Sequence, residues 1–231
     1  MNPIFWFTKQ ISRILHRLPK PPHHGINRSY SHVSKLMRNI TGQEAKILYV
    51  GSLRETDYKY FSPYFKLICI NLEKDKDINV ICDAHWLPFK SSVFDGAILQ
   101  AVLTHVKDAP RMIKETHNTM RAGGAIYIST PFLIEYNPAP EEYVRYTHIG
   151  VRQLLSNFRE IELGVAAGPF VAIFLIIQSI AKNLSPDRDF NFVVWYIGTW
   201  VFYPLNWLDG FIHNKRSMLA SSAAIYYVGV K

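Results

Sequence analysis

The segment 82-CDAHWLPFKSSVFDGAILQAVLTHV-106 decides the fold, because it places one carboxylate, that of Asp83, between two apolar runs. The run that leads into it is 78-INVIC-82, and the run that follows is 94-FDGAILQ-100. Short, continuous apolar runs bounded by turn residues are typical of strands buried on both faces of a parallel sheet. The segment therefore predicts two such strands, with Asp83 directly after the first.

The same pattern extends in both directions along the chain. Further apolar runs are 45-AKILYV-50, 67-LICI-70 and 124-GAIYIST-130. Between residues 107 and 123 the pattern is helical, and it closes at Gly123 and Gly124. Strands that alternate with helices predict a parallel, doubly wound sheet covered on both faces, whose ligands bind beyond the carboxyl ends of the strands.

An apolar insertion interrupts the later part of the chain. A helix is predicted over 151–158 and strands over 160–165 and 223–231, and two uncharged stretches of 19 residues lie at 163–181 and 190–208. If the flanking strands belong to one sheet, the insertion, about 166–218, must return to the side on which it began, as a helical hairpin does. We expect this hairpin to pack on the domain or to enter lipid shallowly rather than to span a bilayer.

Residues 1–40 differ from the rest in charge and pattern, and residues 41–231 form the predicted domain. Of the formal net charge of +8, seven charges come from basic residues before residue 44, where no Asp or Glu occurs. Apolar residues recur at helical spacing through 3–18, and 19-PKPPHHG-25 has the composition of a linker. The basic amphipathic helix has two interpretations: a terminal helix packed on the domain, or a helix on an anionic membrane surface.

Cys69 and Cys82 lie in apolar surroundings, without the Cys and His spacing of a zinc site or a disulfide framework. We therefore predict buried thiols, no metal and a reducing, cytoplasmic compartment, with peripheral contact to the inner face of a membrane as a further expectation. The apolar run 4-IFWF-7 is too short for a signal peptide, and basic residues follow it rather than precede it.

Residues 45–163 together resemble the class I S-adenosylmethionine-dependent methyltransferases, in the methyltransferase type 11-like branch. The signatures are Asp-Ala-x-x-Leu-Pro-Phe with Phe-Asp at 83–95, and Leu-x-His-Val at 103–106. The segments 130-TPFLIEYNPAPEEYVRYTHIGVRQLL-155 and 164-GVAAGP-169 narrow the resemblance to one subgroup. It implies an α/β fold with a Rossmann-like, seven-stranded, mostly parallel sheet, helices on both faces, a helical insertion before the last strand, and S-adenosylmethionine as cofactor.

The resemblance also implies which residues contact the cofactor. An adenine ring at a strand edge needs an acceptor for its amino group and apolar walls; Asp83 supplies the acceptor, with Ala84 beside it and Leu87 and Phe89 near the ring. A helix cap or turn is the alternative role of Asp83. The other expected contacts are Gly51 and Ser52 after the first strand, Asn71 and Leu72 after the second, and Gln100, otherwise an ordinary polar strand end, after the fourth.

The sequence departs from the family at the cofactor end. Relatives carry an acid and a second glycine after the first strand, where this chain has Tyr49 and Leu53, and a ribose-binding carboxylate where it has Asn71. An amide makes one hydrogen bond where a carboxylate accepts two, so we expect cofactor binding to be weaker by ~1–3 kcal/mol unless other contacts compensate. Thr104 stands where the family more often has Glu before the Leu-x-His-Val histidine.

Methyl transfer is an in-line displacement in which the protein aligns the acceptor and excludes water, and a base is needed only when the acceptor keeps its proton. The candidates for base or acceptor positioning are His105, Tyr143, Arg145, Tyr146 and His148. Structural alternatives are a helix-start cap for His105, an ion pair with Glu141 or Glu142 for Arg145, and loop packing for the tyrosines.

We therefore expect a methyltransferase that acts at oxygen on a small-molecule or lipid-linked acceptor close to a membrane surface. The alternative is a protein of the same fold, a scaffold or a repurposed enzyme, that does not methylate. Nucleic acid is not an expected partner, because the basic residues lie on an amphipathic helix and linker without an aromatic stacking platform.

Overall fold

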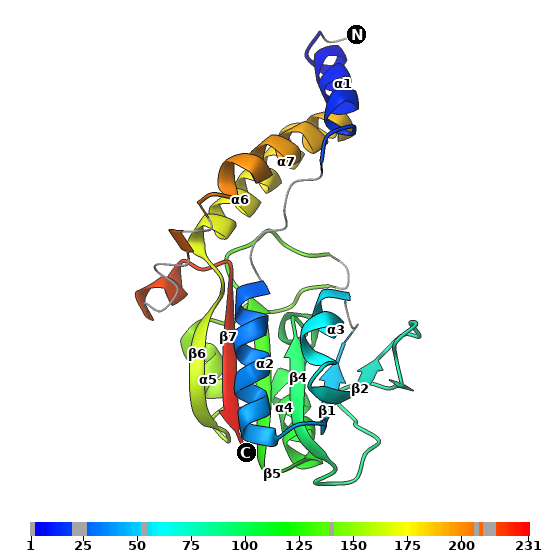
Figure 1. Cartoon of the computed structure of the whole chain (residues 1–231), viewed down its shortest axis with the longest axis vertical. Helices are drawn as coiled ribbons and strands as arrows, with labels where there is room; N and C mark the ends of the chain where they lie inside the picture. The colour runs from blue at the N-terminus through cyan, green and yellow to red at the C-terminus, as the bar shows by residue number, and fades with distance from the viewer. Residues whose placement is uncertain (1–2, 20–26, 52–54, 139–140, 206–207, 210–215) are drawn as a thin grey trace.

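A seven-stranded sheet forms the core of the lower part of the molecule in Figure 1. The computed structural model describes residues 3–19, 27–51, 55–138, 141–205, 208–209 and 216–231. The strands are β1 Ala45–Val50, β2 Phe65–Asn71, β3 Val80–Ile81, β4 Phe94–Gln100, β5 Met120–Pro131, β6 Arg159–Ala167 and β7 Ala224–Val230. Their order is β3-β2-β1-β4-β5-β7-β6; β7 runs antiparallel to β5 and β6, and the other pairs are parallel. The predicted Rossmann-like, mostly parallel sheet is confirmed.

The central strands bury apolar side chains on both faces. In β4, Ala97 and Leu99 belong to the core on one face of the sheet, and Ile98 belongs to the core on the other. Successive side chains of a strand point to opposite faces, so a strand with helices on both sides needs a continuous apolar run. The run in residues 94–100 meets this requirement, which is why it forms a central strand.

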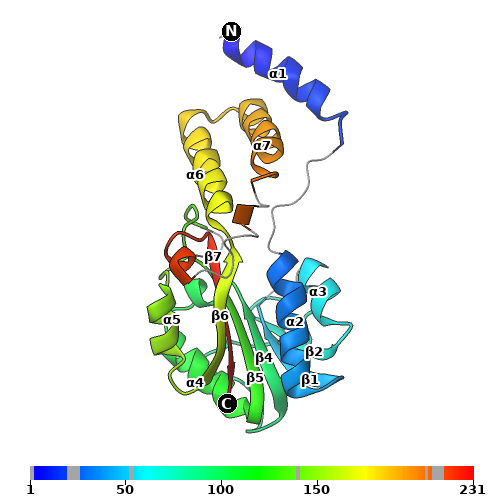
Figure 2. The same cartoon turned by 60° about the vertical axis from the view of Figure 1, so that its left-hand side comes forward.

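Helices cover both faces of the sheet (Figure 2). They are α2 Asn27–Thr41 and α3 Glu55–Phe61 on one face and α4 Ala109–Thr119 and α5 His148–Leu154 on the other, with short 3-10 helices η1 Leu103–His105 and η2 Arg216–Ala220. Met112 of α4 and Val151 of α5 are buried in the first core, and Met37 of α2 and Phe61 of α3 are buried in the second. The sheet is therefore the middle of three layers.

The sequence predicts one helix before residue 41, whereas the structure has two. α1 spans Pro3–Leu15, inside the predicted range 3–18. The second, α2, buries Tyr30, Val33 and Met37 against the sheet. It therefore belongs to the layer that covers the sheet, although it lies before the boundary predicted at residue 41. The predicted linker lies almost entirely outside the described residues.

The predicted helix over 107–123 is shorter in the structure, because α4 ends at Thr119 and β5 begins at the next residue. The Gly-Gly pair lies in this strand instead of closing a helix. Gly123 has a φ of +80°, and a Cβ on Gly124 would lie 2.8 Å from the carbonyl oxygen of Asp95 in β4. The glycines thus permit a close, irregular approach of β5 to β4, where the register of the two strands shifts.

The insertion before the last strand is a helical hairpin of α6 Pro169–Leu184 and α7 Arg188–Phe202. Asp187 begins α7, since its carboxylate accepts a hydrogen bond of 2.7 Å from the N–H of Phe190. α1 packs on α7, and α1, α6 and α7 stand away from the sheet as a helical arm (Figures 1 and 2). The arm leaves the sheet at the end of β6, which runs parallel to β5, and so at the edge where the parallel strands end.

Within the described ranges, no helix combines the length and the apolar character needed to cross a membrane.

The burial of α2 leads to a first prediction. Met37→Ala removes a fully buried side chain and is expected to lower the free energy of unfolding by ~2–5 kcal/mol, because a cavity is left between α2 and the sheet. Lys35→Ala, on the exposed side of the same helix, is the matched control and should change it by less than ~0.5 kcal/mol. Urea unfolding followed by circular dichroism measures both; equal, small effects would mean that α2 is not part of the folded domain.

Candidate functional site

The carboxyl edge of the sheet contains the point where the strand order reverses, between β1 and β4. Gly51 follows β1 there with a φ of +103°, and its N–H donates a hydrogen bond of 2.9 Å to the carbonyl of Ile70 in β2. A Cβ at this position would lie 2.8 Å from Cγ2 of Val102, which follows β4. Only glycine allows this approach without strain. Ser52 and Leu53, which complete the predicted cofactor loop, lie outside the described residues.

A buried carboxylate lies beside the end of β1, although the sequence has Tyr49 where relatives have an acid. The hydroxyl of Tyr49 donates a hydrogen bond of 2.7 Å to Oδ2 of Asp57, and both residues are fully buried. Asp57 comes from the first turn of α3, where a negative charge favours the helix dipole. Sequence reasoning missed this residue; its one signal was an acid in the first turn of the helix that follows the loop.

The predicted ribose contacts, Asn71 and Leu72, lie at the end of β2. Asn71 is the last residue of the strand, and its carbonyl accepts a hydrogen bond of 2.9 Å from the N–H of Cys82 after β3. The side chain of Leu72 is exposed. Both residues therefore lie at the carboxyl edge, one strand away from Gly51.

β3 ends at Ile81, earlier than the predicted run to residue 82, so Asp83 lies two residues after the strand. Its carboxylate accepts two hydrogen bonds from His85, one from the backbone N–H at 2.9 Å and one from Nδ1 at 2.6 Å. Both reach Oδ1, so Oδ2 is left as an acceptor within the described part of the chain. Burial would raise the pKa of Asp83, but the hydrogen bonds from His85 and the charges of His85 and Arg111 lower it, and the net shift is downward. The carboxylate is nearly half exposed and stays ionised at neutral pH.

The apolar residues expected around the adenine have other contacts. Leu87 is buried in the core, and Phe89 packs edge-on against Phe94 with ring centroids 5.0 Å apart. Ala84, next to Asp83, is packed against the same core. These side chains hold the turn after β3 in place.

A stacked pair that sequence reasoning missed lies next to Asp83. The guanidinium of Arg111 lies 3.1 Å from the ring centroid of Trp86, and its Nε donates a hydrogen bond of 3.0 Å to the carbonyl of His85. Arg111 comes from the first turn of α4, so it ties the turn that carries Asp83 to the helix after β4. Trp86 is largely exposed and adds an aromatic surface to this edge.

Three residues near the ends of β4 and β5 have a buried side-chain atom without a partner in the part of the chain that the structure describes. Oε1 of Gln100, Oγ1 of Thr104 and Oγ1 of Thr130 are buried and have no hydrogen-bond partner within the described residues. Gln100 and Thr130 lie at the ends of β4 and β5, and Thr104 lies in η1 just beyond β4. A buried polar group without a partner costs about 1–3 kcal/mol, so a ligand or a water molecule that supplies the partner would be stabilised there.

Arg145 organises the loop between β5 and α5. Its side chain makes hydrogen bonds to both carboxylate oxygens of Glu142 and to the carbonyls of Phe132, Ile134 and Glu135. These bonds use all five N–H groups of the guanidinium. Glu142 is buried, and although burial raises the pKa of its carboxyl, hydrogen bonds from Arg145 and Asn137 and the charges of Arg145 and His105 lower it below its usual range. The ion-pair alternative for Arg145 is thus present, with Glu142 as the partner.

His105 and Tyr143 connect η1 to the same loop. Nδ1 of His105 lies 3.2 Å from the carbonyl oxygen of Glu141, and the N–H of Tyr143 donates a hydrogen bond of 2.7 Å to the carbonyl of Thr104. The Tyr143 hydroxyl donates to the Glu141 carboxylate at 3.0 Å. His105 is therefore held by the loop that Arg145 shapes.

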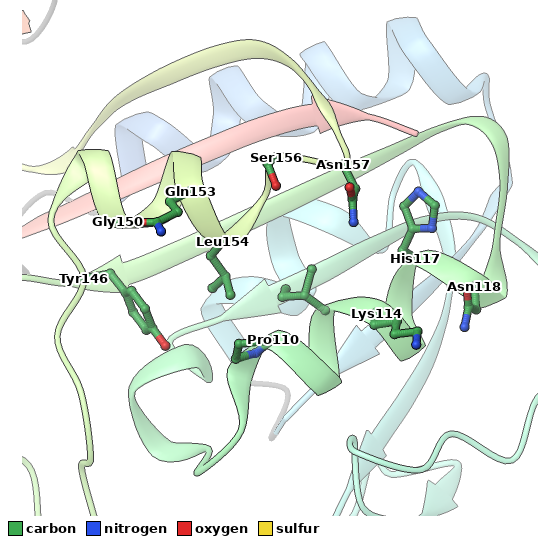
Figure 3. Close-up of a pocket in the computed structure, with 11 residues that line it drawn as sticks. Pro110, Lys114, His117, Asn118, Tyr146, Gly150, Gln153, Leu154, Ser156 and Asn157 are labelled. Carbon is green, nitrogen blue, oxygen red and sulfur yellow. The ribbon is translucent and has the colours of Figure 1, made fainter.

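Tyr146 and His148 lie further along the loop, and neither side chain hydrogen-bonds to His105 within the described residues. His148 is the first residue of α5, directly after Thr147, which caps that helix. Tyr146 lines an open cavity of about 700 Å³ between α4 and α5, together with Pro110, Lys114 and His117 (Figure 3). Burial and the charge of Asp108 raise the pKa of its hydroxyl. The structure therefore groups His105 with Arg145 and places Tyr146 in the cavity between the two helices.

Part of the chain matches a known protein family in sequence. The family model described as "Methyltransferase domain" matches residues 60–128. No curated protein matches the chain in sequence.

Several solved structures have the same fold. A protein from Galdieria sulphuraria assigned as a sarcosine dimethylglycine methyltransferase is 12% identical, with a TM-score of 0.58 over 88% of this chain and 84% of that chain. The [4+2]-cyclase SpnF is 12% identical, with a TM-score of 0.54 over 87% and 80%. The 1,6-didemethyltoxoflavin-N1-methyltransferase of Burkholderia thailandensis is 16% identical, with a TM-score of 0.54 over 89% and 78%. Likeness at such low identity shows the fold alone.

The Arg145–Glu142 pair leads to a second prediction. Arg145→Ala leaves a buried carboxylate without its partner and should lower the free energy of unfolding by ~2–4 kcal/mol. Arg152→Ala is the matched control, since it breaks a two-point ion pair with Glu160 in which both side chains are about one-third exposed, and should cost no more than ~1 kcal/mol. Chemical denaturation measures both; a loss no larger for Arg145 than for Arg152 would contradict a loop-shaping role.

The Asp83–His85 contact leads to a third prediction. His85→Ala removes the imidazole donor, so the pKa of Asp83 should rise toward its ordinary value, while His148→Ala should leave it unchanged. Because the folded-state pKa is lowered, the stability that Asp83 contributes is present above its ordinary pKa and is lost as pH falls through the folded-state pKa. Carbon-detected NMR titration of the carboxyl groups measures the shift, and an unshifted pKa in His85→Ala would contradict the assigned contact.

Proposed function

We propose that this chain, which has the fold of the class I S-adenosylmethionine-dependent methyltransferases, transfers the methyl group of S-adenosylmethionine to an acceptor bound at the carboxyl edge of the sheet. The observation that carries the proposal is the unpartnered, buried Oε1 of Gln100, at the switch point where Gly51 passes Val102. In an open α/β sheet, ligands bind at this point.

The residues at the edge fit the parts of the cofactor. Gly51 is proposed to lie beside the methionine and ribose, with the side chain of Val102 filling the space that a Cβ at residue 51 would take. Asn71 and Leu72 are proposed to flank the ribose at the end of β2. Asp83 and Ala84 meet the adenine, since Oδ2 of Asp83 can accept a hydrogen bond from an amino group. Oε1 of Gln100 can accept one from the ammonium group of the methionine part, which would satisfy this buried atom. When bound, the cofactor supplies a methyl group activated by the adjacent sulfonium.

His105 is the proposed base. A backbone carbonyl only accepts hydrogen bonds, so the contact between Nδ1 and the carbonyl of Glu141 places the proton on Nδ1. In the neutral ring, Nε2 is then free of a proton and can accept one from a hydroxyl acceptor. Tyr146, His148 and Arg145 are proposed to position the acceptor around this loop, Arg145 by holding the loop in shape.

The acceptor is proposed to carry a hydroxyl group, in a small molecule or a lipid-linked compound near a membrane surface. Two features support this placement. The helical arm leaves the sheet at the carboxyl edge. Lys182 of α6 also forms an ion pair of 2.7 Å with Glu135, in the loop that holds His105. The arm is therefore in contact with the loop that holds the proposed base.

A protein that keeps the fold without methylating is the second candidate, and the amide of Asn71 in place of a ribose-binding carboxylate favours it. The likeness to SpnF supports it too, because that protein is a [4+2]-cyclase with the same fold.

Titration calorimetry with S-adenosylmethionine and S-adenosylhomocysteine tests the proposal. Wild type should bind both in the micromolar range. Asp83→Ala and Gln100→Leu should each weaken binding about tenfold or more, because each removes a protein atom that is proposed to accept a hydrogen bond from the ligand. Glu44→Gln is the control and should bind as wild type does. Glu44 carries an exposed carboxylate just before β1, at the opposite edge of the sheet. Absence of binding up to millimolar ligand would refute methyl transfer and favour the non-methylating candidate.

A further inference from the structure

The helical arm exposes a continuous apolar stripe on α6. Ile173, Ile176, Ile177, Ile180 and Leu184 are all more than two-fifths exposed. Their spacing of three and four residues places them on one face of the helix. α7 adds Ile197, Trp200 and Val201, which are exposed to a similar degree. An apolar surface of this extent is rare on a protein that stays in water and marks an interaction site.

α1 also exposes large apolar side chains, while its buried positions among the described residues are polar. Its buried residues include Thr8 and Ser12, at 8% and 1% exposure, while Phe7 and Ile14 are each 60% exposed. A helix that packs on a water-soluble body does the opposite and buries its large apolar residues. Small and hydroxyl-bearing residues at the helix contact, with large apolar residues facing outward, are typical of helices surrounded by lipid.

The contact between α6 and α7 also uses a small residue. A Cβ on Gly198 of α7 would lie 2.7 Å from the ring of Phe174 in α6, so the glycine lets the two helices approach closely. Thr199, next to it, is buried, and its hydroxyl donates a hydrogen bond of 2.6 Å to the carbonyl of Trp195 in the same helix. The hydroxyl of Thr199 is thus satisfied within its own helix, as a surrounding lipid phase requires. Nε2 of Gln178 and Oδ1 of Asn191 are buried in the arm without a hydrogen-bond partner within the described residues.

The charges on α1 indicate what kind of surface the arm meets. Lys9 and Arg13 are exposed and lie beside the apolar face formed by Phe7 and Ile14, and Arg17, in the turn that follows α1, is exposed as well. A basic row next to an apolar face fits a bilayer with anionic headgroups. A second copy of the chain fits less well, because two α1 helices facing each other would bring like charges together.

The length and the tip of the hairpin determine how deep it can lie. α6 has 16 residues, about 24 Å of helix, which is shorter than the hydrocarbon core of about 30 Å. The tip of the hairpin carries Asp187, which caps α7, and Arg188 and Asp189, the first two residues of α7. Insertion by the tip would bury these charges in hydrocarbon. The arm can instead lie along the membrane, with its exposed faces in one leaflet.

We propose that the exposed faces of α1, α6 and α7 embed in one leaflet of a bilayer that contains anionic phospholipids, and so hold the carboxyl edge of the sheet at the membrane surface. This inference extends the membrane placement given in the proposed function and identifies the surface responsible. The ion pair between Lys182 and Glu135 connects this surface to the loop that holds His105.

Flotation of the full chain with lipid vesicles, in the absence of cofactor, tests the inference. The chain should float with vesicles of phosphatidylcholine and phosphatidylglycerol, and much less with phosphatidylcholine alone. The double variant Ile177→Ser/Ile180→Ser should lose about tenfold or more in apparent affinity, because it removes apolar surface that lipid would cover. Ile149→Ser is the matched control, since Ile149 is 57% exposed on α5 of the sheet domain, and should float as wild type does.

Charge reversal and fluorescence complete the test. Arg13→Glu/Arg17→Glu should abolish the preference for anionic vesicles, and Lys35→Glu/Lys114→Glu, two exposed positions on α2 and α4, should retain it. Brominated lipids should quench tryptophan fluorescence, and less in Trp200→Phe than in Trp86→Phe, because Trp86 lies on the sheet domain.

Equal flotation of the isoleucine double variant and wild type would overturn the inference. A lipid-free dimer in light scattering that Ile177→Ser/Ile180→Ser dissociates would overturn it in favour of a second copy. Because the vesicle experiment contains no cofactor and the calorimetry contains no lipid, failure of membrane docking and failure of the proposed methyl transfer are seen separately.

Discussion

The close approach of Gly51 to Val102 is the constraint on which the rest of the structure depends. It brings the turn after β1 within van der Waals contact of the segment after β4, at the point between β1 and β4 where the strand order reverses. Any side chain at residue 51 would push these segments apart and move Gln100 away from the end of β1. The carboxylate of Asp83, two strands further along the sheet, shares this edge because parallel strands end on the same side. Glycine at residue 51 therefore permits the close packing of these two segments at the switch point.

Much of the fold could be predicted from the sequence, because central strands with two buried faces leave an unambiguous apolar run. β1 and β4 have the predicted bounds for this reason. α2 was missed because its buried residues, Tyr30, Val33 and Met37, are few among polar ones, and its stability comes from the sheet that it covers. The end of α4 was placed too late because a Gly-Gly pair is a helix stop in isolation, whereas here it serves a strand contact that no local pattern reveals.

The candidate site divides in the same way. Gly51, Asp83 and Gln100 could be predicted to share one edge because each ends a strand or lies within two residues of its end, where position along the chain fixes position in space. Asp57, His85 and Arg111 could not be predicted, because each contributes through a contact that forms only on folding. Asp57 binds the hydroxyl of Tyr49, His85 binds the carboxylate of Asp83, and Arg111 stacks on the indole ring of Trp86. Arg145 could be predicted as an ion-pair or acceptor-positioning residue, but its hydrogen bonds to three backbone carbonyls of the loop could not. Backbone carbonyls are the same in every residue and so carry no sequence signal. Ser52, although predicted, lies outside the described residues.

Because β7 is the last strand of the described sheet to be synthesised, the sheet stays incomplete until this strand is made. This strand lies between β5 and β6, and β6 pairs only with β7 in the described sheet. During synthesis, both neighbours leave the ribosome before the strand that joins them, and so do α6 and α7. The nascent chain therefore carries two open strand edges and an apolar hairpin at the same time. Such a chain needs protection from aggregation until β7 arrives, and a lipid surface that takes up the hairpin early would provide it.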